Sequence, residues 1–171
     1  MTSVSDPIKV TVPVTKPDGI TVPALRAFYE ENVKDKMSRD CATADILALV
    51  KDLTKAATPD GGTGISYCQL LRQQQKAVKS SADDVGPANF FISHAWKYNF
   101  YDFLVALEIK FKSQPGVYLW IDNFCHNQHE ELTSDEWITV FEQHIVSINN
   151  TVMIVFPWDN PIPFTRSTHS R

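Results

Sequence analysis

Polar and aromatic side chains follow three short apolar runs in the second half of the chain. Serine, histidine, asparagine and aspartate can hydrogen-bond a polar ligand, and tryptophan can stack on a flat one. Polar groups flanked by tryptophans are typical of sites for planar, polar ligands such as nucleotides. The predicted ligand-binding residues are Ser93, His94, Trp96, Asp122, Asn127, Trp158 and Asp159.

Each of these residues also has a purely structural interpretation. Ser93 can hydrogen-bond the backbone at a strand end, and His94 can be a structural histidine. Asp122 can cap a loop or hold a neighbouring amide. Tryptophans pack in cores more often than they stack on ligands, and the patterns around Trp120 and Trp137 indicate core positions. Both interpretations stay open at the level of sequence.

A second possible chemistry lies in the cluster of Cys125, His126 and His129. Thiolate and imidazole are natural zinc ligands, so a zinc-dependent hydrolase is one hypothesis. Adjacent cysteine and histidine side chains diverge in most backbone geometries, however, and no fourth ligand is evident, so no metal site is expected. Nucleophilic catalysis by Cys125 would need a neighbouring base that lowers the pKa of its thiol.

The apolar runs alternate with segments of helical pattern. Residues 89–93, 117–121 and 151–156 are short and β-prone, whereas 98–113 and 136–148 carry apolar residues at helical spacing. Strands that are apolar on both faces and alternate with helices predict a parallel sheet covered by helices on both sides. Ligands bind such sheets outside the carboxyl ends of the strands, which is where the polar segments fall.

The first half of the chain has a different pattern. Four prolines interrupt the β-prone runs of residues 1–23, which predicts an extended or disordered leader. Amphipathic helices are expected at 24–36, 43–53 and 66–78, with a flexible loop at 58–64. The predicted organisation is a leader at 1–23, a helical N-terminal extension at 24–85 and an α/β domain at 86–171.

Composition limits the class of protein. The 171 residues, 43% of them hydrophobic, suit one globular core. A net charge of -4 without a basic stripe argues against nucleic-acid binding. No signal sequence or membrane span is evident, and the three cysteines form no CxxC pair, so we expect a cytoplasmic protein without membrane association or a disulfide framework.

Three segments together resemble a known family. They are FFISHAWKYNFYDFLVALE, VYLWIDNFCHNQH and TVMIVFPWDNPIPFTR. In this order and spacing they are similar to a divergent TIR-like domain family of protist, algal and fungal intracellular proteins. There a strand ending in Ser-His-Ala-Trp precedes a Trp-bearing strand with an Asn-Gln-His loop, and a third strand leads to Thr-Arg-x-Trp-Cys-x-x-Glu. The stretch TADILALVKDLTKAATPDGGTGISYCQLL also resembles the segment before that domain, so the likeness covers about residues 24–167.

The resemblance implies a flavodoxin-like, three-layer α/β sandwich in a signalling module that binds protein partners or itself. In some relatives the domain cleaves the nicotinamide-ribose bond of NAD with a glutamate from the Trp-Cys-x-x-Glu segment. Here the chain reads Thr168-His169-Ser170-Arg171 and stops, so that glutamate would fall past its end and the domain is expected to be incomplete at the C-terminus.

Two functions follow from this resemblance. The preferred one is a non-catalytic interaction module with no required cofactor, which self-associates or binds NAD or a related nucleotide without turnover. The alternative is an NAD glycohydrolase that takes its acid from Asp159, Glu130 or a partner chain.

Overall fold

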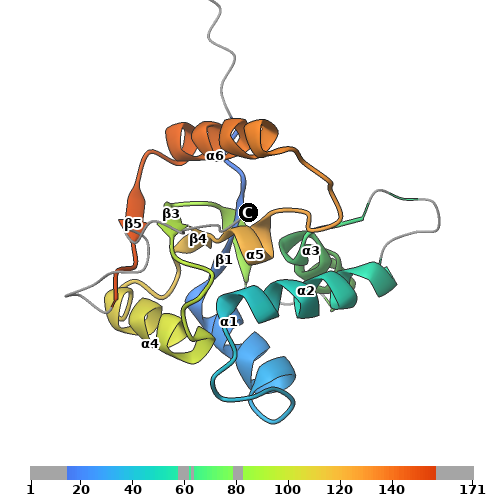
Figure 1. Ribbon diagram of the computed structural model, residues 1–171, viewed down its shortest axis with the longest axis vertical. Coiled ribbons are helices and arrows are strands. Elements are labelled where there is room, and N and C mark those ends of the chain that lie inside the picture. Colours follow the sequence, from blue (N-terminus) through green and yellow to red (C-terminus); the bar gives the residue numbers. More distant parts are fainter. Residues whose placement is uncertain (1–14, 58–61, 63, 79–82, 157–171) are drawn as a thin grey trace, which may run out of the picture.

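A five-stranded mixed sheet forms the centre of the computed structural model, which describes residues 15–57, 62, 64–78 and 83–156. The strands are β1 (Asp18–Thr21), β2 (Val85–Pro87), β3 (Phe90–Ser93), β4 (Tyr118–Trp120) and β5 (Thr151–Met153). Their order across the sheet is β2-β1-β4-β3-β5 (Figure 1). The protein is therefore an α/β protein, as the sequence predicts.

Three of the strands are parallel, and these are the strands expected from the apolar runs. β3 pairs in parallel with β4, with Phe91 opposite Trp120, and with β5, with Ile92 opposite Val152. β1 is antiparallel to both of its neighbours, β2 and β4. The prediction of an all-parallel sheet is wrong for β1 and β2, two short strands from the N-terminal part of the chain that complete the sheet.

β1 also corrects the prediction for the leader. Asp18–Thr21 lies inside the sheet, and Ile20 is completely buried. Proline is excluded from the interior of a central strand but tolerated beside it and in the first turn of a helix. Pro17 precedes β1, and Pro23 lies in the first turn of α1, so both prolines flank the strand without breaking its pairing. Residues 1–14 lie outside the described residues.

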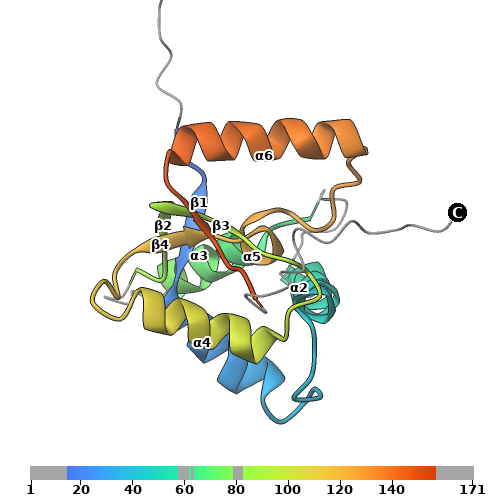
Figure 2. The same ribbon diagram turned by 60° about the vertical axis from the view of Figure 1, so that its left-hand side comes forward.

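Helices cover both faces of the sheet. Helices α1 (Val22–Phe28) and α4 (Phe100–Lys110) lie on one face, and α6 (Ser134–Ile148) crosses the other (Figure 2). α1 continues into a π-helical turn at Tyr29–Val33. α2 (Thr43–Ala57) and α3 (Tyr67–Val78) pack beside the one-turn helix α5 (Asp122–Cys125). The predicted layers of helix, sheet and helix are confirmed.

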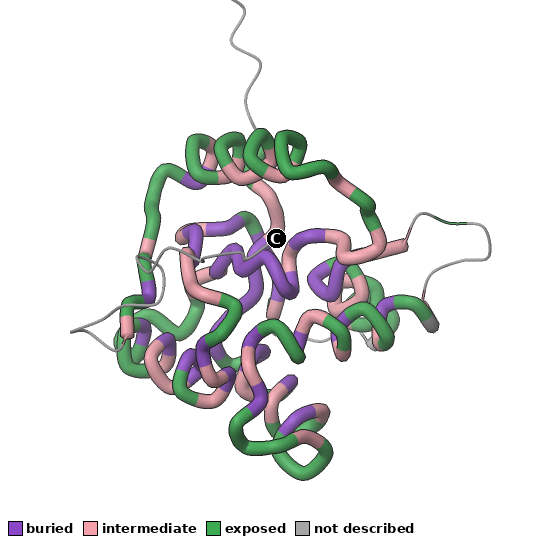
Figure 3. The backbone as a smooth tube through the Cα atoms, viewed as in Figure 1, coloured by how far each residue is buried: buried purple, intermediate pink, exposed green. Residues whose placement is uncertain are grey.

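The N-terminal helices share one apolar core with the sheet. The ring of Phe28 on α1 meets Tyr67 at 5.1 Å and Phe124 at 5.0 Å between ring centroids. Buried segments gather in the sheet and beneath it, whereas α6 presents a largely exposed outer surface (Figure 3). Trp120 is 1% exposed, as expected of a core residue, but Trp137 on α6 is only half-buried.

Within the described residues, no helix has the length and hydrophobicity required to span a membrane.

Candidate functional site

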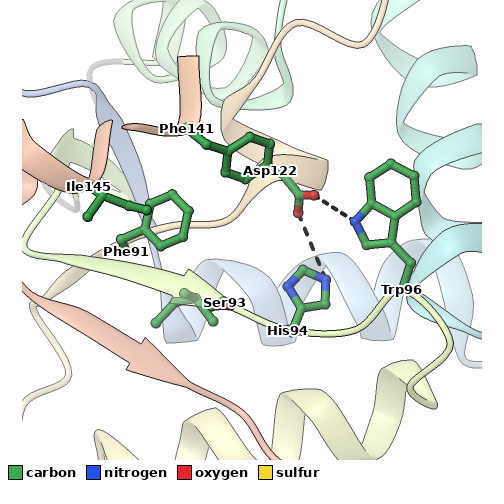
Figure 4. Close-up of a pocket in the computed structure, with 8 residues that line it drawn as sticks. Phe91, Ser93, His94, Trp96, Asp122, Phe141 and Ile145 are labelled. Carbon is green, nitrogen blue, oxygen red and sulfur yellow. Dashed lines mark hydrogen bonds and ion pairs between the residues drawn. The ribbon is translucent and has the colours of Figure 1, made fainter. Parts of the chain in front are cut away.

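The carboxyl ends of β3 and β4 form one wall of a pocket of about 280 Å³ (Figure 4). Ser93 ends β3, His94 and Trp96 follow it, and Asp122 comes two residues after the end of β4. Because β3 and β4 are parallel neighbours, their ends bring these four side chains to the same edge of the sheet. Four of the predicted ligand-binding residues therefore line one pocket.

Asp122 organises the polar side of this pocket. Its Oδ2 accepts a hydrogen bond from Trp96 Nε1 at 2.7 Å, and its Oδ1 accepts one from the backbone N of Asn123 at 2.9 Å. The carboxylate is 8% exposed, so water competes little for these bonds. Asp122 thus holds the amide of Asn123, which is the structural role that the sequence suggested for it. It also orients Trp96 at the pocket mouth.

His94 places an unpaired nitrogen beside that carboxylate. Its side chain is 2% exposed, and its Nε2 lies 3.9 Å from Asp122 Oδ1, beyond hydrogen-bond distance. Nε2 is buried and has no hydrogen-bond partner among the described residues. Burial lowers the pKa of His94 below its ordinary value, although the Asp122 carboxylate opposes the shift. His94 is therefore uncharged at pH 7, and its buried Nε2 has no protein partner of ordinary hydrogen-bond geometry, although the Asn123 side chain also favours the charged ring.

The opposite wall of the pocket is apolar and aromatic. Phe91 from β3 stacks on Trp120 with ring centroids 4.8 Å apart and meets Phe141 of α6 edge-on at 5.7 Å. Ile145, one helical turn after Phe141, completes this wall. The pocket thus combines an aromatic and aliphatic wall with a polar rim, which suits one ring system with hydrogen-bonding edges.

The sequence pattern did not indicate that this apolar wall belongs to a site. The helical spacing of Phe141 and Ile145 indicated an inward face of α6, but spacing cannot specify which strand that face covers. It covers β3, next to the pocket.

The structure separates Asn127 from this pocket, against the prediction. Asn127 lines a second, polar pocket of about 230 Å³, where its Nδ2 donates to Gly64 O at 3.3 Å and to Glu130 Oε1 at 3.2 Å. The reason is local, because the α5 turn and the loop after it lead the chain away from the end of β4. Trp158 and Asp159 lie outside the described residues.

The side chains of the proposed zinc cluster contact separate neighbours. His129 Nε2 lies 2.9 Å from Thr54 Oγ1, Cys125 Sγ lies 3.5 Å from Cys68 Sγ, and the ring of His126 packs on Trp137. Among the residues that the structure describes, no three histidine, cysteine or acidic side chains are grouped to hold a metal ion. The geometry thus gives the zinc-hydrolase hypothesis no support.

No protein-family model, curated protein or solved structure matches this chain. The class that its fold and site define is an α/β protein with a mixed sheet and a pocket at the carboxyl ends of two parallel strands.

Proposed function

We propose that the chain is a TIR-like signalling module that binds the planar end of a nucleotide, such as NAD, between β3, β4 and α6 without turning it over. The observation that carries the proposal is the buried, unpaired Nε2 of His94 beside the Asp122 carboxylate. A buried polar atom without a partner costs stability unless something else satisfies it, and a ligand is one such partner.

The chemistry of the pocket favours a ring that bears an amide or amine. Each carboxylate oxygen has two lone pairs, so Asp122 can accept a further N–H while it keeps its bonds to Trp96 and Asn123. Neutral His94 offers a second polar contact next to it. A volume of about 280 Å³ lies at the lower limit of small-molecule pockets, which fits one ring system and not a whole dinucleotide.

The strand order supports the flavodoxin-like part of the proposal. Across the sheet the three parallel strands have the order β4-β3-β5, so the strand that comes first in the chain lies between the second and the third. The doubly wound flavodoxin-like sheet begins with the same 2-1-3 order. The helices that connect them, α4 and α6, lie on opposite faces, as right-handed crossovers require (Figure 2).

The proposal that the module does not turn over its ligand is supported by the hydrogen bonds that the Asp122 carboxylate already accepts. Asp122 is the one carboxylate among the described residues that line the pocket, and both of its oxygens already hold protein donors. A carboxylate engaged in this way orients groups and is poorly placed to stabilise a developing oxocarbenium charge.

Ligand-induced thermal shift and calorimetry with NAD, nicotinamide and adenosine monophosphate test the proposal. A ligand at one hundred times its Kd should raise the melting temperature by roughly 5–10 °C. His94→Phe keeps an aromatic ring and removes Nε2, so it should abolish the shift. His144→Phe makes the same change on α6 against Trp120, outside the pocket lining, and should keep the shift.

Two results would overturn the proposal. One is the absence of binding by all three compounds, and the other is binding that persists in His94→Phe. Nicotinamide release from NAD is measured in the same samples. Steady release that Asp122→Asn abolishes would establish the NAD glycohydrolase in place of the non-catalytic module.

Exposed apolar residues on α6 and β5 support protein partners, and we propose self-association through this surface. β5 is the last strand of the sheet in the described residues, and Met153 on it is 49% exposed. Val146 on α6 is 74% exposed. Scattered exposed apolar residues are common, so the proposal rests on their position next to β5, whose outer edge is unpaired among the described residues.

Light scattering of the purified chain tests this association. Val146→Glu should lower the measured mass toward that of the monomer, since it places a charge in the interface. Ile109→Glu makes the same type of change on α4, where Ile109 is 73% exposed, and should leave the mass unchanged. A monomeric wild-type chain would contradict self-association.

A further inference from the structure

Two cysteine side chains from distant parts of the chain lie in contact between α3 and α5. Cys68 is the second residue of α3 and Cys125 is the last residue of α5, and their Sγ atoms are 3.5 Å apart. Both thiols are free. α3 and α5 lie side by side in both ribbon views (Figures 1 and 2).

The two thiols differ in their access to small molecules. Cys68 is completely buried. Cys125 is half-buried and lines the polar pocket of about 230 Å³, together with Ser66, Gln69 and Asn127. A small polar oxidant can therefore reach Cys125 first, and Cys68 only through Cys125.

The hydrogen bond between the two sulfurs also distinguishes Cys125 from Cys68. The Cys68 thiol donates to Cys125, and this bond, together with burial, raises the pKa of Cys68. Cys125 Sγ also accepts the backbone N–H of Ile121 at 3.3 Å, and its own S–H donates to the carbonyl oxygen of Leu119 at 3.5 Å. The direction of the bond between the two sulfurs and the greater access of Cys125 make Cys125 the sulfur that is oxidised first and Cys68 the thiol in reserve.

We propose that Cys125 and Cys68 form a redox pair, in which a hydroperoxide oxidises Cys125 and Cys68 then closes a reversible disulfide between α5 and α3. This inference does not depend on the ligand proposed for the pocket at β3 and β4.

The chemistry balances in two steps. The Cys125 thiolate attacks one oxygen of hydrogen peroxide, the O–O bond breaks, and the sulfur becomes a sulfenic acid while the other oxygen leaves as water after protonation. The Cys68 sulfur then attacks the Cys125 sulfur, and the S–O bond breaks. The Cys68 proton goes to the departing hydroxide, which gives a second water. Two thiols and one peroxide thus yield one disulfide and two waters.

The movement required is small. A disulfide has an S–S length of about 2.05 Å, so the sulfurs must approach each other by roughly 1.5 Å from their 3.5 Å contact. Cys125 lies at the C-terminal end of a one-turn helix, and closing the disulfide exchanges the bonds of its sulfur to the Ile121 N–H and the Leu119 carbonyl for the covalent bond. Cys41, the third cysteine, is buried beside the start of α2, and burial raises the pKa of its thiol. It serves as an internal control.

Titration of the reduced full chain with hydrogen peroxide tests the pair. We expect the number of free thiols to fall from three to one, with Cys68 and Cys125 joined in a single peptide by mass spectrometry after alkylation in denaturant. Dithiothreitol should restore all three thiols. The cross-link closes a long loop, so the oxidised chain should melt higher by roughly 10 °C.

Three variants identify the role of each sulfur. Cys68→Ser leaves Cys125 without its partner, so Cys125 should proceed from the sulfenic to the sulfinic acid. Cys125→Ser should protect Cys68 from oxidation, because no peroxide reaches it. Cys41→Ser should form the disulfide as the wild type does.

The inference fails if wild-type Cys125 becomes a sulfinic acid while Cys68 remains a free thiol. It also fails if the disulfides that form involve Cys41 or join two chains, or if peroxide leaves all three thiols reduced in the folded protein.

Discussion

Asp122→Asn is the most informative substitution in the pocket, because it keeps the shape of the side chain and removes its charge. In the native protein the carboxylate accepts two N–H donors, Trp96 Nε1 at 2.7 Å and Asn123 N at 2.9 Å. An asparagine offers one acceptor oxygen and a donor nitrogen. One of the two N–H groups must therefore lose its partner and face a second donor.

The magnitude follows from which bond is lost. A hydrogen bond to a charged group contributes about 1.5–3 kcal/mol, and a buried donor without a partner costs about 1–3 kcal/mol. Trp96 is 45% exposed, so its N–H can turn toward water, whereas Asn123 is 2% exposed. The asparagine should therefore keep its oxygen on Asn123 and release Trp96. We expect a loss of about 2 kcal/mol of unfolding free energy, or a fall of roughly 4–8 °C in Tm.

Guanidinium denaturation, followed by tryptophan fluorescence and circular dichroism, measures this loss. Asp52→Asn is the matched control, since it makes the same change on the exposed face of α2 and should alter the unfolding free energy by less than about 0.5 kcal/mol. If Asp122→Asn matches that control with an unchanged m-value, the carboxylate does not hold the loop after β3, and the reasoning is refuted.

Three further predictions concern pH, a glycine and a helix cap. Burial lowers the pKa of three histidines, so below about pH 6.5 the native state binds fewer protons than the unfolded chain, and the unfolding free energy should fall as the pH drops from 7.5 to about 5.5. These histidines are His94, His126 and His144. Denaturation curves across that range check this, and a flat profile would contradict it. Gly64 has a φ of +86°, and a Cβ there would lie 2.5 Å from the His129 side chain, so Gly64→Ala should lower the unfolding free energy by about 2 kcal/mol. Gly116→Ala, whose Cβ would meet nothing within 4 Å, is the control, and equal losses in both variants would disprove the clash. Thr133 and Glu136 form a capping box at the start of α6, so Thr133→Ala should cost about 1 kcal/mol in urea denaturation, and Thr133→Ser should recover most of it.

Local sequence patterns predict the parallel half of the fold. Residues 89–93, 117–121 and 151–156 are short, apolar on both faces and separated by helical patterns, so their local signals and the crossover rule predict three parallel strands. The same rule located a candidate site, because parallel neighbours end at the same edge of a sheet. Ser93, His94, Trp96 and Asp122 consequently line one pocket.

The antiparallel strands and the second pocket depend on contacts between distant parts of the chain. β1 is four residues long, begins Asp-Gly and has prolines close to both ends, so its own sequence is a weak signal for a central strand. Its strand conformation comes from pairing with β2 and β4. Long-range packing also brought Cys68 to within 3.5 Å of Cys125, across 57 positions of sequence, and lined the second pocket with Ser66 and Gln69 as well as Asn127. Contacts of this kind depend on how helices dock, and sequence spacing within one element carries no record of them.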